Sequence, residues 1–262
     1  MSAGYAARNM PAFNRSRVIF STHGIRQNHH LGDFCNALYT RKPEETFSVK
    51  VDAEISTMTG VAAVMTYTNQ IRYGETPPIM LDIKLGDMPK VVAEAAKTLG
   101  EVHQPVAFTV NPSSGLRSLQ AAVANKGACL VVVSTVNTSL DDDDCLRIYN
   151  RTRFEQVLVF AEMAAEANAD AIIVGGWEVK ELKARGISHR LAVYCAGVRP
   201  DWHPNAGNNW RTVTPTQAFQ NGADKIIIGD PVLSQKGPLE QRAAALRIIH
   251  EVNAALRVPT LV

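Results

Sequence analysis

The sequence alternates short β-branched runs with segments of helical spacing, and this alternation limits the possible folds more than any other feature. Eight strand-like runs are bounded by turn residues, at 18–21, 47–51, 79–84, 106–110, 130–135, 171–174, 191–195 and 225–228. Helical spacing lies between them, at 89–99, 116–124, 154–167, 178–184, 215–221 and 239–256. Such alternation favours right-handed crossovers and a parallel sheet. A count of eight predicts an α/β fold of the (β/α)8 TIM barrel type, with an open doubly wound sheet as the alternative.

No change of composition interrupts this pattern, and 262 residues are an ordinary length for one barrel. We therefore predict a single barrel domain over residues 18–262, preceded by a flexible N-terminal arm over residues 1–17. The arm carries Arg8, Arg15 and Arg17 but no apolar stretch of signal-peptide length. The acidic run 141–144 is expected to be a turn that leads into a helix.

Charge and cysteine content restrict the partners and the compartment. A net charge of +2 is too small for the broad basic surface that nucleic-acid binding requires. The longest apolar runs are strand-sized, so no membrane span is expected. The four cysteines are far apart and form no CxxC pair, which predicts reduced thiols and a cytoplasmic protein.

Charged residues gather at the end of the third strand-like run. Asp82 and Lys84 are two positions apart and share a face of a strand, and Asp87 follows just before a helix. Lys50 and Asp52 share a face at the end of the second run. Because active sites of barrels lie at the C-terminal ends of the strands, these charges are candidates for one site. A rim network of surface salt bridges is the alternative explanation.

These residues fall in a motif of a known family. The segment Asp82-x-Lys84-x-x-Asp87-Met88-Pro89 resembles the D-x-K-x-x-D-I-P signature of the orotidine 5'-monophosphate decarboxylase family. Four later segments resemble motifs of that family in the same order, namely TVNTS at 135–139, AGVRP at 196–200, RTVTP at 211–215 and GADKIIIG at 222–229. Sugar-phosphate decarboxylases and hexulose-phosphate synthases share D-x-K-x-x-D, so the ordered series is more specific than the single motif.

The resemblance implies a carboxy-lyase of pyrimidine biosynthesis that needs neither cofactor nor metal and acts on a small pyrimidine nucleotide. Lys84 would protonate the carbanion left by decarboxylation, Asp82 would lie against the substrate carboxylate, and Lys50 would bridge Asp82 and the ribose. Asp87 would reach the active site of a neighbouring subunit, so the resemblance also implies a homodimer with shared sites. The substrate contacts that it suggests are Thr22, His23, Asn111, Thr138, Ser139, Arg199, Asn209, Gly229 and Asp230.

The sequence departs from the family pattern on the side of the phosphate and the ribose. Gly229-Asp230-Pro231 stands where the family has an arginine after glycine, and Asn209 stands in place of a glutamine. Val91 replaces a hydroxyl residue. The first run lacks its usual aspartate, so Thr22 or His23 would substitute, and Asn111 replaces a histidine. We therefore expect the chemistry to be kept and the phosphate contacts to be altered, which leaves an unphosphorylated or modified orotidine-like nucleoside as an alternative substrate.

The sequence also allows four other interpretations. A non-catalytic ligand-binding barrel would explain the altered contacts, and a magnesium-dependent barrel enzyme would use the same third strand. His23, His29 and His30 lie near Asp33 and together suggest zinc, but adjacent histidines cannot share one helical face. The pair Gly175-Gly176 permits a close backbone approach, although a plain turn explains it equally well.

Overall fold

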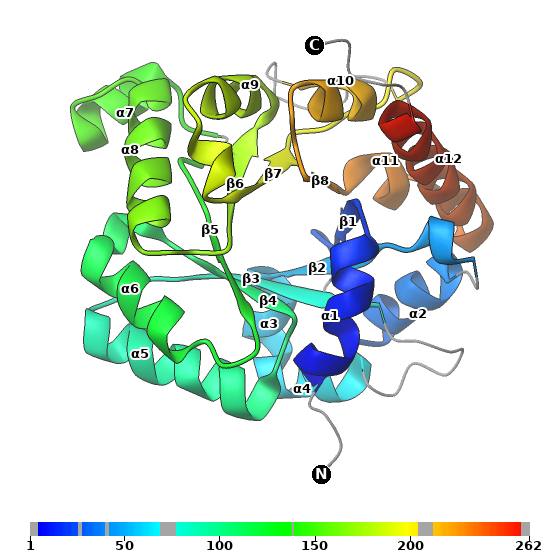
Figure 1. Ribbon diagram of the computed structural model, residues 1–262. Coiled ribbons are helices and arrows are strands. Elements are labelled where there is room, and N and C mark those ends of the chain that lie inside the picture. Colours follow the sequence, from blue (N-terminus) through cyan, green and yellow to red (C-terminus); the bar gives the residue numbers. More distant parts are fainter. Residues whose placement is uncertain are drawn as a thin grey trace.

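The computed structural model describes residues 5–25, 28–39, 42–68, 77–137, 139–203 and 212–257. They form a closed barrel of parallel strands in chain order (Figure 1). The strands are β1 (Val18–Ser21), β2 (Ser48–Asp52), β3 (Ile79–Leu85), β4 (Ala107–Val110), β5 (Leu130–Val133), β6 (Ala171–Gly175), β7 (Ala192–Ala196) and β8 (Lys225–Ile228). Because β8 pairs with β1, the predicted barrel is confirmed and the open-sheet alternative is wrong.

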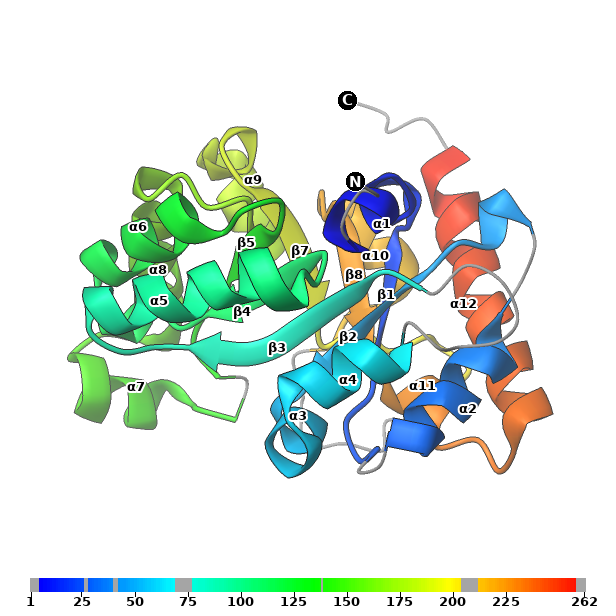
Figure 2. The same cartoon turned by 90° about the horizontal axis from the view of Figure 1, so that it is seen from below.

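Helices surround the barrel and cover the apolar outer face of its strands (Figures 1 and 2). The α-helices are α1 (Tyr5–Arg15), α2 (Asn28–Leu38), α3 (Ala53–Thr59), α4 (Val61–Thr68), α5 (Pro89–Thr98), α6 (Leu116–Asn125), α7 (Asp142–Tyr149), α8 (Arg153–Glu166), α9 (Gly176–Ala184), α10 (Pro215–Gln220), α11 (Asp230–Leu233) and α12 (Pro238–Arg257). Short turns of helix are η1 (Pro43–Glu45), η2 (Leu99–His103), η3 (Pro112–Ser114) and η4 (Ile187–His189). All six predicted helices are present, and none of their ends differs from the prediction by more than two residues.

Local sequence signals explain where several helices begin. Proline stands in the first turn of α5, α10 and α12, where its missing amide hydrogen is not needed. Thr152 and Glu155 form a capping box at the start of α8. The acidic run begins α7 as predicted, because the Asp141 side chain accepts a hydrogen bond from the amide of Asp144.

The predicted flexible arm is wrong for residues 5–15, which form helix α1. Tyr5 and Phe13 of this helix are buried, and the Tyr5 hydroxyl donates to the carbonyl of Pro77 at 2.8 Å. At the other end of α1, the Lys225 ammonium donates to the carbonyl of Phe13 at 2.6 Å and to that of Ser16. Figure 2 shows α1 on the opposite side of the barrel from α3 and α7. The helix therefore covers the N-terminal ends of the strands, where its apolar side chains are buried.

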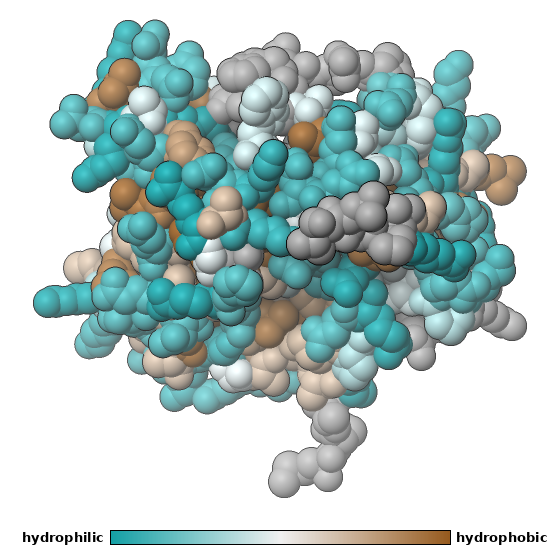
Figure 3. All heavy atoms as spheres, turned by 45° about the horizontal axis from the view of Figure 1, so that its top comes forward, coloured by the Kyte–Doolittle hydropathy of each residue, from teal (hydrophilic) through white to brown (hydrophobic). Residues whose placement is uncertain are grey.

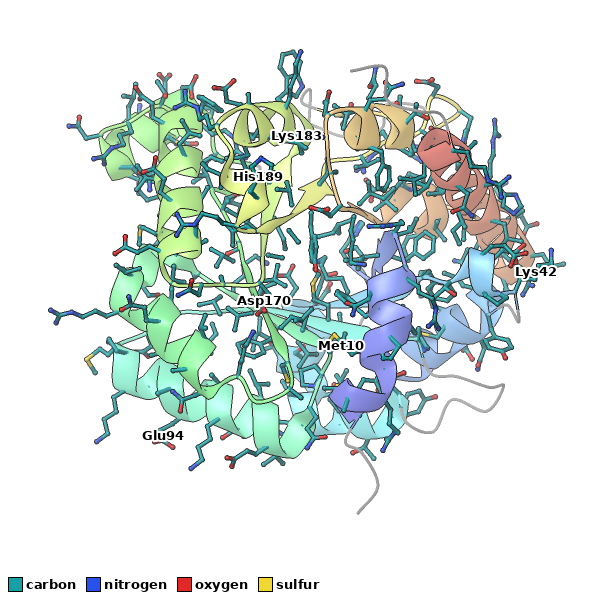
Figure 4. All side chains as sticks on the ribbon, in the orientation of Figure 1. Met10, Lys42, Glu94, Asp170, Lys183 and His189 are labelled. Carbon is teal, nitrogen blue, oxygen red and sulfur yellow. The ribbon has the colours of Figure 1, made fainter. Side chains whose placement is uncertain are left out.

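The surface is that of a polar protein. The face in Figure 3 is mostly hydrophilic, with hydrophobic residues scattered singly or in small groups. Figure 4 shows Lys42 and Glu94 pointing away from the molecule, whereas Asp170 lies at the barrel, where it accepts a hydrogen bond from the amide of Val131 at 2.8 Å. Within the described part of the chain, no helix combines the length and the apolar character needed to cross a membrane.

Candidate active site

Two lysines and two aspartates meet at the C-terminal ends of β2 and β3. Asp52 and Asp82 are partners in the register of these strands, so their carboxylates leave the sheet at the same level. The Lys50 ammonium donates to Asp82 Oδ2 at 2.6 Å and to Asp52 Oδ1. Lys84 Nζ donates to Asp82 Oδ1 at 3.0 Å. We call these four residues the Lys–Asp array, and their grouping is the one that the strand spacing predicted.

Lys84 departs from regular strand geometry. Its φ is 46°, and the pairing of β3 with β4 shifts between Leu81 and Leu85. The left-handed conformation costs a residue with a side chain about 1–2 kcal/mol. The Lys84 amide donates to Thr109 Oγ1 at 2.8 Å, and the same hydroxyl donates to Asp82 Oδ1 at 2.9 Å. Thr109 of β4 thus holds both the strained backbone of the lysine and the carboxylate that the lysine contacts.

Sequence reasoning did not identify Thr109 as part of the site. The available signal was a polar residue inside the otherwise apolar run Ala107–Val110. A fully buried hydroxyl needs hydrogen-bond partners, and the end of a barrel strand is where functional groups lie. This signal alone does not indicate which residues the hydroxyl contacts.

Burial and charge act in opposite directions on the array. Asp82 and Lys50 are buried, whereas the Lys84 side chain is 52% exposed. Burial by itself would raise the pKa of Asp82, but the ammonium groups of Lys50 and Lys84 lower it to about 2. Burial by itself would lower the pKa of Lys50, but the carboxylates of Asp82 and Asp52 raise it above its ordinary value. The attraction between the opposite charges outweighs burial and keeps Lys50 and Asp82 charged at neutral pH.

Asp87 lies beyond the array, at the surface of the chain. Its Oδ1 accepts a hydrogen bond from the amide of Met88 at 2.6 Å, and its carbonyl accepts one from Ser118 at 2.7 Å. Met88 and Val91 beside it are exposed apolar side chains. The D-x-K-x-x-D segment therefore presents Lys84 to the barrel mouth and Asp87 to the outside.

A second polar cluster joins the ends of β1, β7 and β8. Asp230 Oδ1 lies 2.6 Å from His23 Nε2, and Asp230 Oδ2 accepts from the Arg199 guanidinium. Gly229 packs against the imidazole, since a Cβ at this position would lie 2.9 Å from His23 Nδ1. The family resemblance aligns Asp230 with a residue that would contact a phosphate. In the structure its carboxylate is already paired with Arg199 and with His23, a residue that can also carry a positive charge. We call His23, Arg199 and Asp230 the Asp230 clamp.

At the end of β1, the structure distinguishes the two residues proposed for the missing aspartate. Thr22 is buried and its hydroxyl donates to the carbonyl of Lys50 at 3.2 Å, which leaves it engaged with the backbone. His23 has a half-exposed side chain. Ser21, which sequence reasoning did not select, donates to Asp52 Oδ2 at 2.9 Å and so links β1 to the Lys–Asp array.

Of the remaining predicted contacts, the two that the structure describes, Asn111 and Ser139, follow the C-terminal ends of β4 and β5. The Asn111 side chain accepts from the amide of Ser113 at 3.0 Å, so it caps η3. Ser139 is exposed, and its amide donates to the Asn137 side chain at 3.1 Å. Thr138 and Asn209 lie outside the described residues, as does the start of the segment 211–215.

The histidines after β1 do not form a metal cluster among the residues that the structure describes. No group of three or more His, Cys, Asp or Glu side chains in that part of the chain is arranged to hold a metal ion. His23, His30 and Asp33 instead line a cavity of about 450 Å³ between the end of β1 and the start of α12. The His29 side chain lies outside the described residues.

Comparison with known proteins identifies the family. Residues 28–245 match the model of the "Orotidine 5'-phosphate decarboxylase / HUMPS family". The chain belongs to this family. An orotidine 5'-phosphate decarboxylase of Methylococcus capsulatus is 34% identical over 178 residues, which are 68% of this chain and 72% of that protein. One from Paramagnetospirillum magneticum is 32% identical over 229 residues, which are 83% and 92% of the two chains.

The structural comparison agrees with the family match. The crystal structure of orotidine 5'-phosphate decarboxylase from Lactobacillus acidophilus has a TM-score of 0.73 and 26% sequence identity, covering 91% of this chain and 99% of the other. The orotidine 5'-monophosphate decarboxylase of Sulfolobus solfataricus, at 18% identity and a TM-score of 0.60, shares the fold. The match to the orotidine 5'-phosphate decarboxylase / HUMPS family includes β2 to β8 and the whole Lys–Asp array but begins after β1. His23 of the Asp230 clamp therefore lies outside the matched region.

Proposed function

We propose that this protein decarboxylates orotidine 5'-monophosphate to uridine 5'-monophosphate, as a carboxy-lyase of pyrimidine biosynthesis. The observation that carries the proposal is the Lys–Asp array, in which a half-exposed ammonium stands 3.0 Å from a buried carboxylate at the mouth of the barrel. The names of the 30–36% identical relatives support the same reaction.

In the proposed mechanism, the substrate carboxylate lies against Asp82 and leaves as carbon dioxide. The electron pair of the broken bond remains on the pyrimidine ring carbon, and Lys84 delivers a proton to it. An ammonium fixed where negative charge develops lowers the energy of the transition state more than that of the ground state. Thr109 and Lys50 keep Asp82 in place, so the groups need no reorganisation during the reaction.

The chemistry so proposed draws on neither a metal nor an organic cofactor, because Lys84 is the acid and the array supplies the electrostatic stabilisation. Binding must overcome repulsion between the Asp82 carboxylate and that of the substrate. Favourable contacts elsewhere on the nucleotide have to supply this free energy. Ser139, Asn111 and His23 lie on the rim of the same mouth and are the described candidates for such contacts.

We further propose a homodimer with shared active sites. Asp87 is exposed, and its carboxylate accepts a hydrogen bond from the amide of Met88. Met88 and Val91 form an exposed apolar edge next to it, which suits contact with a second copy. The four cysteines are buried, and no disulfide joins them in the described part of the chain, which fits the proposed cytoplasmic location.

A second candidate substrate is an unphosphorylated or differently decorated orotidine-like nucleoside. The Asp230 clamp favours it, because Arg199 and His23 are both engaged by a carboxylate at the loops after β7 and β8. Phosphate sites of barrels commonly lie at these loops. A non-catalytic binding barrel is a weaker candidate, since it would gain nothing from retaining the four charges of the array.

The test is the conversion of orotidine 5'-monophosphate, followed by loss of orotate absorbance in the presence and absence of a chelator. We expect turnover that a chelator leaves unchanged and that Lys84→Ala abolishes without altering the thermal unfolding transition. Undiminished turnover in this variant would refute the assigned mechanism. Inhibition by the chelator would favour a magnesium-dependent reaction instead.

A further inference from the structure

Arg153, the first residue of α8, has its guanidinium group buried beneath the segment that follows β5. The residue is 4% exposed. Nη1 donates to the carbonyl of Asn137 at 2.6 Å and lies 3.5 Å from that of Leu140. Nη2 donates to the carbonyl of Val136 at 3.2 Å. One side chain thus contacts three backbone carbonyls of an irregular segment.

Glu178 of α9 lies beside this guanidinium group. Its Oε1 is 3.3 Å from Arg153 Nε, and the residue is also 4% exposed. A Cβ at Gly175, the last residue of β6, would collide with the Glu178 carboxylate. The close approach that the Gly175-Gly176 pair permits is therefore used, and it lets the carboxylate reach Arg153 from the end of β6.

Gly176, the neighbour of Gly175, packs against the segment that follows β7. A Cβ at Gly176 would collide with Val213. Val213 forms a parallel bridge with Val198, and its carbonyl accepts from the amide of Arg199 at 2.8 Å. The start of α9 thus carries both Glu178, which lies beside Arg153, and Gly176, which packs against the segment after β7.

Global stability does not require such a pair. Desolvating two charges offsets most of their attraction, and apolar residues of similar volume are often as stable in the same place. The pair instead fixes the positions of its hydrogen-bond partners. The planar guanidinium holds its N–H donors in a rigid fork, so each carbonyl that accepts from it must lie along one of the N–H directions. The carbonyls of an irregular segment also need hydrogen-bond partners, and Arg153 donates to those of Val136, Asn137 and Leu140.

We propose that Arg153, oriented by Glu178, is a positioning residue for substrate binding. It fixes the carbonyls of Val136, Asn137 and Leu140, and with them the place of the exposed Ser139 on the rim of the barrel mouth. The expected effect on turnover rests on the proposed function. The ordering of the segment by Arg153 is independent of that function. Arg153 does not touch the reacting atoms, so its removal should weaken binding and alignment and leave the acid–base behaviour of the Lys–Asp array unchanged.

The first measurement is hydrogen exchange at the Ser139 and Leu140 amides, which in the structure donate to the side chain and the carbonyl of Asn137. Arg153→Met keeps much of the side-chain volume and removes the donors. We expect at least about a tenfold rise in exchange at these two amides, the loss that follows from removing hydrogen bonds to a charged group. Arg185→Met is the control, because Arg185 forms an exposed pair with Glu181 and should change neither amide.

The second measurement is steady-state kinetics of the same variants. We expect Arg153→Met to lower kcat/KM by about 100-fold, mostly through KM, as a displacement of about 1 Å can do. The pH profile of kcat should keep its wild-type shape. Arg153→Lys restores the charge but not the fork, so it should recover only part of the loss. Glu178→Gln, which keeps the shape of the side chain, serves as the second variant if Arg153→Met fails to fold.

The results separate the two proposals. Unchanged exchange at Ser139 and Leu140 together with kcat/KM within twofold of the wild type would overturn the positioning role. A rise in exchange spread evenly over α8, α9 and the strands would also overturn it, because that pattern is general destabilisation. If the wild type turns over neither orotidine nor its monophosphate, the proposed function fails. The exchange data would still decide whether Arg153 orders the segment.

Discussion

Replacing Asp230 by asparagine should increase the preference of this enzyme for a phosphorylated substrate. The variant keeps the size of the side chain and removes the carboxylate charge that Arg199 and His23 now share. The quantity to compare is the ratio of kcat/KM for orotidine 5'-monophosphate to that for orotidine. Taking this ratio cancels any effect of the substitution on the chemical step, since both substrates undergo the same decarboxylation.

The size of the effect follows from two contributions. Arg199 becomes available to the phosphate, and a hydrogen bond to a charged group is worth about 1.5–3 kcal/mol. The Asp230 side chain is only 29% exposed, so its repulsion of a phosphate is at least as strong as in water. A unit charge and a dianion about 5 Å apart then repel by about 1.7 kcal/mol. Because asparagine still accepts a hydrogen bond from Arg199, we take about 2–4 kcal/mol in total, or roughly 30- to 1,000-fold in the ratio.

The assay is the loss of orotate absorbance with each substrate at the same ionic strength. Asp201→Asn is the matched control, because it removes an exposed carboxylate two residues from Arg199 and lies outside the clamp. Asp230→Arg should raise the ratio further, since it adds a cation as well as removing an anion. The reasoning is wrong if the wild type already prefers the phosphate by many decades and neither Asp230 variant changes the ratio.

Four further outcomes are expected. Thr109→Val should lower kcat by about 10- to 100-fold, because Asp82 loses a hydrogen bond and the strained Lys84 amide loses its acceptor; kinetics with a thermal-unfolding control tests this. The pKa of Asp82 is lowered from 3.8 to about 2 by the lysines, so its contribution to the free energy of unfolding should be complete above pH 4 and be lost as the pH falls toward 2. The free energies of unfolding of wild type and Asp82→Asn, measured by urea titration, should therefore converge over that pH interval. A difference that stays constant would contradict this prediction. Mixing Lys84→Ala with Asp87→Ala under subunit exchange should restore part of the activity, whereas recovery of none would count against shared sites. Light scattering should give the mass of two chains, and a single-chain mass at working concentration would exclude the proposed dimer.

The sequence was sufficient for the overall fold and for the centre of the site. Short continuous apolar runs and the eightfold strand–helix alternation indicate a parallel barrel, because each strand is buried on both faces and must be covered by a helix before the next begins. The parity of a strand also places Lys50 with Asp52 and Asp82 with Lys84, and the shared end of parallel strands brings these pairs together. Local spacing was enough here because the interacting groups lie on adjacent strands.

Only the tertiary structure decided the contacts between elements that are distant in the chain. Thr109 supports Lys84 because a bulge in β3 turns the lysine amide toward β4, and spacing along one strand does not reveal a bulge. Helix α1 is ordered because its apolar side chains pack against the N-terminal ends of the barrel strands. The composition of the short N-terminal segment does not show that it will find this packing surface.

The same holds for charges. The sequence shows that Asp230 is an anion near a cationic loop, but its partners depend on where the ends of β1, β7 and β8 converge. Arg153 is one arginine among many until α8 and α9 place it beside Glu178 under the segment after β5. Sequence determined which groups this protein has at the ends of its strands. Closure of the barrel decided which of them meet, because it joins the first strand to the last and fixes the distances between loops that the chain itself leaves far apart.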